Sequence, residues 1–128
     1  MITIKIGSLI AAKPVLQELA NTKMTAKQSF QVLRILKIID VEYANIEQAQ
    51  KKLFENHAQR DENGNLVLNE DGTGYIVPNE NRMAFMKEMD EFTSGEINLE
   101  CEQFAMELLD NMILTPNQLM AIESFIKE

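Results

Sequence analysis

The sequence has a single histidine, His57, a single cysteine, Cys101, and no tryptophan. One cysteine excludes an internal disulfide, and one histidine excludes a cluster of histidines as a zinc site. A Cys–His nucleophile pair would need a motif that positions the two residues together, and the sequence contains none. We therefore interpret Cys101 as a core residue and His57 as a favourable charge near a helix C-terminus.

Long apolar runs are also missing, since no stretch approaches the roughly 18 residues of a membrane-spanning helix. The first eight residues lack the basic start, apolar core and small-residue cleavage site of a signal peptide. The sequence shows no interdomain linker, internal repeat or low-complexity tract. We therefore expect a single domain, residues 1–128, in the cytoplasm of the cell that makes it.

The net charge of −8 is unevenly distributed. Residues 1–60 contain nine Lys or Arg and five Asp or Glu (+4), whereas residues 61–128 contain three and fifteen (−12). Two interpretations stay open: the halves attract each other within the fold or across a subunit contact, or the two faces have different partners. The surplus of acid favours solubility and argues against direct nucleic-acid binding.

Residues 25–60 predict one long helix. It begins with a capping box, in which Thr25 and Gln28 satisfy each other's backbone amides. Between residues 30 and 41 the helix is apolar nearly all round and should be covered on several sides. Its second half keeps only a narrow apolar seam with heptad spacing, so we expect a homodimer or larger oligomer through this helix. The seam residues recur in steps of three and four, interrupted only by Gln50: Val32, Leu36, Ile39, Tyr43, Ile46 and Leu53.

The remaining sequence predicts an α+β fold, mainly helical, with three to four shorter helices and a small antiparallel sheet containing a hairpin. Alternating patterns predict strands at 2–6 and 96–101, and Asn-Gly and Asp-Gly turns predict a hairpin over 65–78. Short helices are expected after the first strand, with a break near Pro14, over 79–92, over 102–111, and from Thr115 onward.

The acidic segments do not predict a metal or catalytic site. The turn that starts at Asp61 has Leu66 and Gly72 where a calcium loop needs a glycine and a glutamate, so turn chemistry explains it better. No spacing in the acidic C-terminal half singles out a catalytic pair of carboxylates. We expect a solvated face there, with imitation of nucleic-acid charge as the alternative, and we expect no metal, cofactor or enzymatic activity.

Basic residues supply the candidate ligand site. Lys27, Arg34 and Lys37 lie on the thin polar stripe of the long helix, and Arg82 opens a later helix near Tyr75. If this stripe lines a seam between subunits, it forms a basic, dehydrated place for a carboxylate or phosphate. The alternative is that the stripe meets the protein's own acidic half.

The sequence contains eight methionines, and three of them are close together at positions 83, 86 and 89. Methionine is flexible and polarizable, so it fills irregular gaps in cores and also suits surfaces that adapt to a partner. We expect core packing, with an interface as the alternative.

The order of these features resembles a group of small proteins, without an assigned activity, that phages and prophages of Gram-positive bacteria encode. The resemblance covers most of the chain, but it lies in capping, turn and core patterns. Members of the group tend to carry an aromatic residue and a glycine where His57 and Ala58 stand here, which argues against a role for His57. The segments that carry the resemblance are residues 51–55, 61–72, 81–92, 96–99 and 114–123.

The resemblance implies a non-enzymatic binding protein that blocks or sequesters a host component. The target would be a host protein, including a defence factor, or a small anionic ligand such as a nucleotide. Two alternatives stay open: a factor in virion assembly, and an acidic inhibitor that imitates nucleic acid. A carboxylate-dependent hydrolase is a further alternative without a supporting motif.

Overall fold

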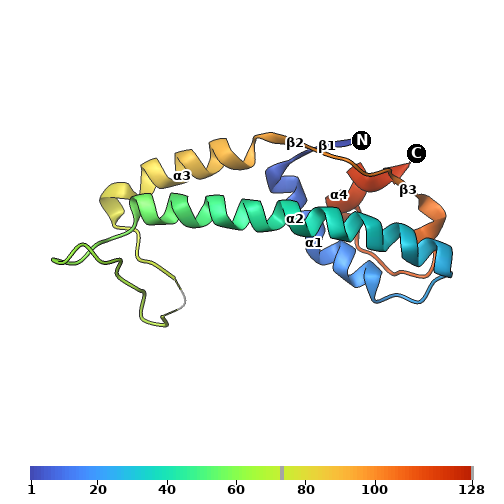
Figure 1. Ribbon diagram of the computed structural model, residues 1–128, viewed down its shortest axis with the longest axis horizontal. Helices are drawn as coiled ribbons and strands as arrows, with labels where there is room; N and C mark the ends of the chain where they lie inside the picture. Colours follow the sequence, from blue (N-terminus) through green and yellow to red (C-terminus); the bar gives the residue numbers. More distant parts are fainter. Residues whose placement is uncertain (73, 128) are drawn as a thin grey trace. The chain divides into compact units, whose positions relative to one another are not determined.

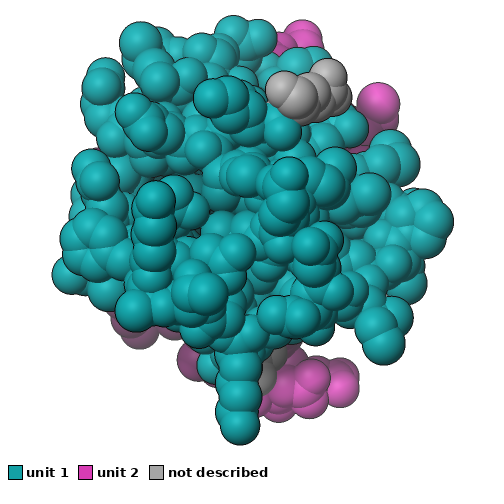
Figure 2. Space-filling model, turned by 90° about the vertical axis from the view of Figure 1, so that its right-hand side faces the viewer, with its two compact units in different colours: residues 1–44, 94–128 teal, residues 45–93 magenta. Residues whose placement is uncertain are grey.

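The computed structural model describes residues 1–72 and 74–127, and the chain is mainly helical with a small antiparallel sheet (Figure 1). The predicted mainly helical α+β class is confirmed, since about 60% of the chain is helical, one helix has 32 residues and a small antiparallel two-stranded sheet is present. Contacts divide the chain into two compact units, coloured separately in Figure 2. Unit 1 comprises residues 1–44 and the described residues from 94 onward, and unit 2 comprises the described residues between 45 and 93.

The antiparallel sheet of unit 1 pairs β1 (Ile2–Lys5) with β2 (Glu96–Leu99). The period-two pattern turns Ile2 and Ile4 inward, where both are almost completely buried. The register places Ile2 opposite Leu99, which is also buried. The two predicted strands are therefore present over shorter ranges, 2–5 instead of 2–6 and 96–99 instead of 96–101, and they pair with each other.

The helix α1 (Ile6–Ala20) continues directly from β1 and passes through Pro14 without a break. The predicted break at Pro14 is therefore wrong. Pro14 is exposed, so the Ile10 carbonyl that loses its N–H partner can hydrogen-bond water, and packing of the opposite side holds the helix together. The buried residues of that side are Ile6, Leu9, Ala12, Val15, Leu16 and Leu19.

The long helix α2 (Ala26–His57) begins at the predicted capping box. The Thr25 hydroxyl accepts the Gln28 amide at 3.2 Å, and the Gln28 side chain accepts the Thr25 amide at 3.3 Å. Residues of α2 up to 44 belong to unit 1, and those from 45 onward belong to unit 2. The structure describes no helix that is long and apolar enough to cross a membrane.

The C-terminal segment of unit 1 is built from short elements. Two-residue strands β3 (Phe104–Ala105) and β4 (Ile126–Lys127) pair in parallel, and α4 (Pro116–Ile122) packs against α1. The predicted start of the last helix is confirmed, because Thr115 and Gln118 form a second capping box. The predicted helix over 102–111 is wrong: β3 is followed there by the 3₁₀ helix η1 (Met106–Leu109). A second 3₁₀ helix, η2 (Glu123–Phe125), leads into β4.

Unit 2 combines the end of α2 with α3 (Asn79–Thr93) and the turn-rich segment between them. The rings of Phe54 and Phe85 join the two helices, with centroids 4.6 Å apart. The predicted hairpin is present as a bridge between Leu68 and Tyr75, and Thr73 at its turn lies outside the described residues. Contrary to expectation, the hairpin is not a member of the β1–β2 sheet, since each of its bridges is isolated.

Candidate functional site

One side of α2 in unit 1 is apolar and uncovered. Phe30, Leu33 and Val41 keep 61%, 47% and 63% of their surface exposed. Only the opposite side of the helix, which carries Val32 and Ile39, is buried. The expectation that this apolar part of the helix is covered on several sides is therefore wrong within this chain.

The three predicted basic residues of α2 share this uncovered side. Steps of three and four residues lead from Lys27 through Phe30, Arg34 and Lys37 to Val41, which aligns them along the helix. The three cations are exposed, and no ion pair within residues 1–72 and 74–127 involves them. The α2 face, as we name it, consists of Lys27, Phe30, Leu33, Arg34, Lys37 and Val41.

The nearest carboxylate along α2 does not neutralise this face, because Asp40 already has a partner. The Lys13 ammonium of α1 lies 3.9 Å from the Asp40 carboxylate and 3.7 Å from the centre of the Tyr43 ring. The half-buried Lys13 thus joins α1 to α2 by an ion pair and a cation–π contact. The α2 face keeps its positive charge in a protein whose net charge is −8.

An open cleft of about 420 Å³ lies beside the α2 face, also within unit 1. Arg34 lines it, whereas Lys27 and Lys37 do not. Glu100 and Glu102 contribute carboxylates to the same cleft, so its charge is mixed. An anion bound beside Arg34 would therefore also meet two negative groups, which makes the cleft a poor match for a phosphate.

Cys101 lines this cleft, just beyond the end of β2, and is half-buried. It is therefore not the core strand residue that its alternation predicted. Burial raises the pKa of the Cys101 thiol above its usual value. A nucleophilic cysteine needs the opposite shift, so the environment of Cys101 favours the inert thiol.

Tyr75 and Arg82, the other two predicted ligand-binding residues, belong to unit 2. Tyr75 is half-buried in the bridge to Leu68, and Arg82 is exposed on α3. The five predicted residues therefore divide between the two units, with three aligned on the α2 face and two outside it.

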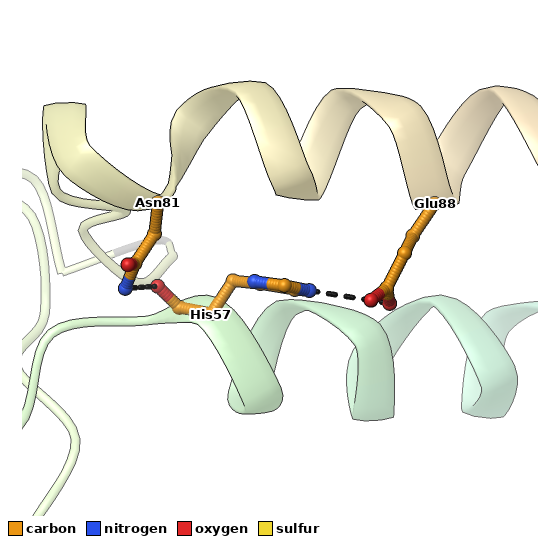
Figure 3. A network of polar contacts seen from close by, with 3 residues as sticks. All are labelled: His57, Asn81 and Glu88. Carbon is orange, nitrogen blue, oxygen red and sulfur yellow. Dashed lines mark hydrogen bonds and ion pairs between the residues drawn. The ribbon is translucent and has the colours of Figure 1, made fainter.

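His57 is the last residue of α2, which ends three residues before the predicted position 60, and it joins α2 to α3 inside unit 2 (Figure 3). Its Nε2 atom lies 3.2 Å from a carboxylate oxygen of Glu88 and makes no hydrogen bond with the described residues. The Asn81 side-chain amide donates to the His57 carbonyl oxygen at 3.0 Å and thereby caps α2. Phe85 packs edge-on against the imidazole ring. These contacts hold the end of α2 against α3.

The described residues contain no group of three or more His, Cys, Asp or Glu placed to hold a metal ion. Asp61, the first residue of the calcium-like turn, uses one carboxylate oxygen to accept the amides of Asn63 and Asn65 at 2.9 and 3.0 Å. Gly64 closes the turn with a φ of +81°. Turn chemistry accounts for these residues, as the sequence indicated.

The exposure of the methionines differs from the core packing that the sequence favoured. Met83 and Met86 are exposed on α3, Met1, Met106 and Met120 are exposed in unit 1, and no methionine is among the buried core residues, so the predicted core packing is wrong. Hydropathy alone carried no signal for this, because an exposed methionine and a buried one look the same in a sequence.

No family model, curated protein or solved structure matches the chain.

Proposed function

We propose that this protein acts by binding an acidic protein partner through the α2 face and has no catalytic role of its own. In the phage setting that the sequence resemblance implies, the partner is a host component that the complex blocks or sequesters. The observation that supports the proposal is one exposed helix side that carries three apolar and three basic side chains, where no ion pair within the described residues involves the basic ones.

The two kinds of side chain on this face would contribute differently to binding. Phe30, Leu33 and Val41 offer apolar surface, whose burial supplies most of the free energy of association. Lys27, Arg34 and Lys37 attract and orient a negatively charged partner, which raises the association rate and fixes the register.

The rest of the molecule strengthens the selectivity of this face. With 20 acidic and 12 basic residues, the protein as a whole repels acidic partners. An acidic partner is therefore accepted only where cations gather, and wrong orientations are penalised by like charges. A small anion in the cleft beside Arg34 is the weaker candidate, because Glu100 and Glu102 line the same cleft.

Charge reversal on the α2 face tests the proposal. Tagged wild-type protein and the Arg34→Glu/Lys37→Glu variant are used to capture partners from a lysate of a Gram-positive bacterium. We expect the wild type to retain one acidic protein in near-stoichiometric amount. When that protein is purified and titrated by calorimetry, the double variant should bind it about 100-fold more weakly, because two attractions become repulsions.

The matched control is Lys51→Glu/Lys52→Glu, which makes the same charge change at exposed positions of α2 that lie outside the α2 face. This control should bind like the wild type. Equal loss in both double variants would reduce the effect to net charge and contradict a specific face, as would a captured partner that the α2-face variant retains.

A further inference from the structure

A second exposed apolar surface lies in unit 1, beside α4. It is a groove of about 320 Å³, and it shares no residue with the α2 face or with the cleft at Arg34. Met106, Leu119 and Met120 are exposed there. The α4 groove, as we name it, is lined by Met106, Pro116, Leu119, Met120, Glu123 and Ile126.

The shape of this surface follows from local sequence. Leu119 and Met120 follow Pro116 by three and four residues, so the three share one side of α4, and Glu123 follows at the C-cap of that helix. The other side of α4 carries Ile122, which is fully buried. The α4 groove is thus an uncovered apolar helix side, flanked by flexible methionines that adapt to a partner's shape.

The charged residue in the lining of the groove is acidic. It is Glu123, and two charged residues follow lining residues in the chain: Glu107 follows Met106 in the 3₁₀ helix η1, and Lys127 follows Ile126 in β4. Both carboxylates are exposed, and neither takes part in an ion pair within the described ranges. The sign is therefore opposite to that of the α2 face, while the apolar character is the same.

We propose that the α4 groove binds the α2 face of a second copy of this chain. The contact places Phe30 and Leu33 of one copy among Met106, Leu119 and Met120 of the other. It also brings Arg34 and Lys37 toward Glu107 and Glu123. An amphipathic helix laid in an apolar groove is a common mode of recognition, and opposite charges at its edges set the orientation.

Charge argues against the simpler arrangement in which two α2 faces pair with each other. About a two-fold axis such a contact sets Arg34 and Lys37 of both copies together, with no acidic member of the α2 face to neutralise them. The apolar seam predicted from the sequence is also partly covered within the chain. Val32, Ile39 and Ile46 of that seam are buried, and the side-chain nitrogen of Gln50, which lies between Ile46 and Leu53 in the seam, is 4.0 Å from the Met89 sulfur.

This contact goes beyond the proposed function and has a consequence for it. The same α2 face would be covered by a neighbouring copy in the free protein and exposed when an acidic partner displaces that copy. Target binding and self-association would then exclude each other.

Complementary charge reversal tests the proposal. Sedimentation velocity over a wide concentration series should show wild-type mass rising above the 14.6 kDa of one chain. The variants Arg34→Glu/Lys37→Glu and Glu107→Lys/Glu123→Lys should each remain monomeric. Mixed in equal amounts, they should associate again, because each variant supplies the charge that the other now needs. Circular dichroism verifies that each double variant is folded.

Wild-type protein that stays monomeric throughout the series overturns the proposal, and so does a mixture of the two folded variants that fails to associate. If a reversal variant unfolds, the neutral pair Arg34→Gln/Lys37→Gln replaces it and should weaken association, while an unchanged mass contradicts the contact. The groove variant Glu107→Lys/Glu123→Lys keeps an intact α2 face. Retained partner binding by this variant separates the two proposals.

Discussion

Cys101 and His57 are the two residues whose surroundings bear on nucleophilic or acid–base chemistry. The thiol of Cys101, half-buried at the cleft, has a pKa raised by burial. The imidazole of His57 lies in the other unit, engaged with Glu88 and with the ring of Phe85. Burial therefore disfavours the thiolate form of Cys101.

Alkylation of Cys101 tests its environment directly. Because a raised pKa lowers the thiolate fraction at a given pH, iodoacetamide should react more slowly with the folded protein at pH 7.5 than with an unfolded chain. The rate should rise as the pH passes the usual thiol range and continue to rise above it. Mass spectrometry follows the reaction, and the same sample in urea is the control. A folded-state rate equal to that in urea would contradict the burial effect.

At the scale of elements, side-chain caps decide where helices begin, and packing decides whether a helix continues through a proline. The capping boxes at Thr25 and Thr115 start α2 and α4 where the sequence indicated. Pro14 was a misleading signal, because proline usually ends a helix and here the buried side of α1 overrides it. Tertiary packing of an amphipathic helix outweighs one missing hydrogen bond.

Replacing Pro14 should therefore stabilise the protein. The substitution Pro14→Ala restores the amide that can bond the Ile10 carbonyl, and the exposed position loses no packing. We expect the free energy of unfolding to rise by about 1–2 kcal/mol, after allowance for the more flexible unfolded chain. Urea denaturation followed by circular dichroism measures it. Gln17→Ala, an exposed change in the same helix, should stay within about 0.5 kcal/mol, and a destabilised Pro14→Ala would refute the account.

At the scale of the whole molecule, the uneven charge of the sequence is distributed over two separate surfaces, the α2 face and the α4 groove. The basic surplus of residues 1–60 includes the α2 face, and the acidic surplus of residues 61–128 includes the edges of the α4 groove. The sequence left open whether such halves meet within the chain or between chains. Because no ion pair within the described residues involves the α2 face or the α4 groove, we assign both surfaces to contacts between molecules.

Salt should distinguish this electrostatic contact from a purely apolar one. Raising NaCl from about 50 mM to about 500 mM shortens the screening length from about 14 Å to about 4 Å, so self-association of the wild type should weaken. The Arg34→Gln/Lys37→Gln variant should respond much less, because its attraction at this contact is already lost. Sedimentation equilibrium gives both constants. Association that is unchanged or stronger at high salt would show that apolar burial alone drives it.

The sequence by itself determined the features that depend on neighbours along the chain. Strand alternation at Ile2 and Ile4, the caps at Thr25 and Thr115, and the turn at Asp61 all follow from local geometry and hydrogen bonding. These interactions span a few residues, so a pattern within one segment is sufficient to predict them.

Only the tertiary structure decided which apolar sides are covered. Val32 and Ile39 are buried while Phe30 and Val41 on the same helix are exposed, although both pairs have the heptad spacing of a packed seam. Spacing tells which residues share a side, but burial depends on which distant segment packs there. For that reason the basic stripe was visible in the sequence, whereas the exposure of the apolar residues beside it and the groove at α4 emerged only from the fold.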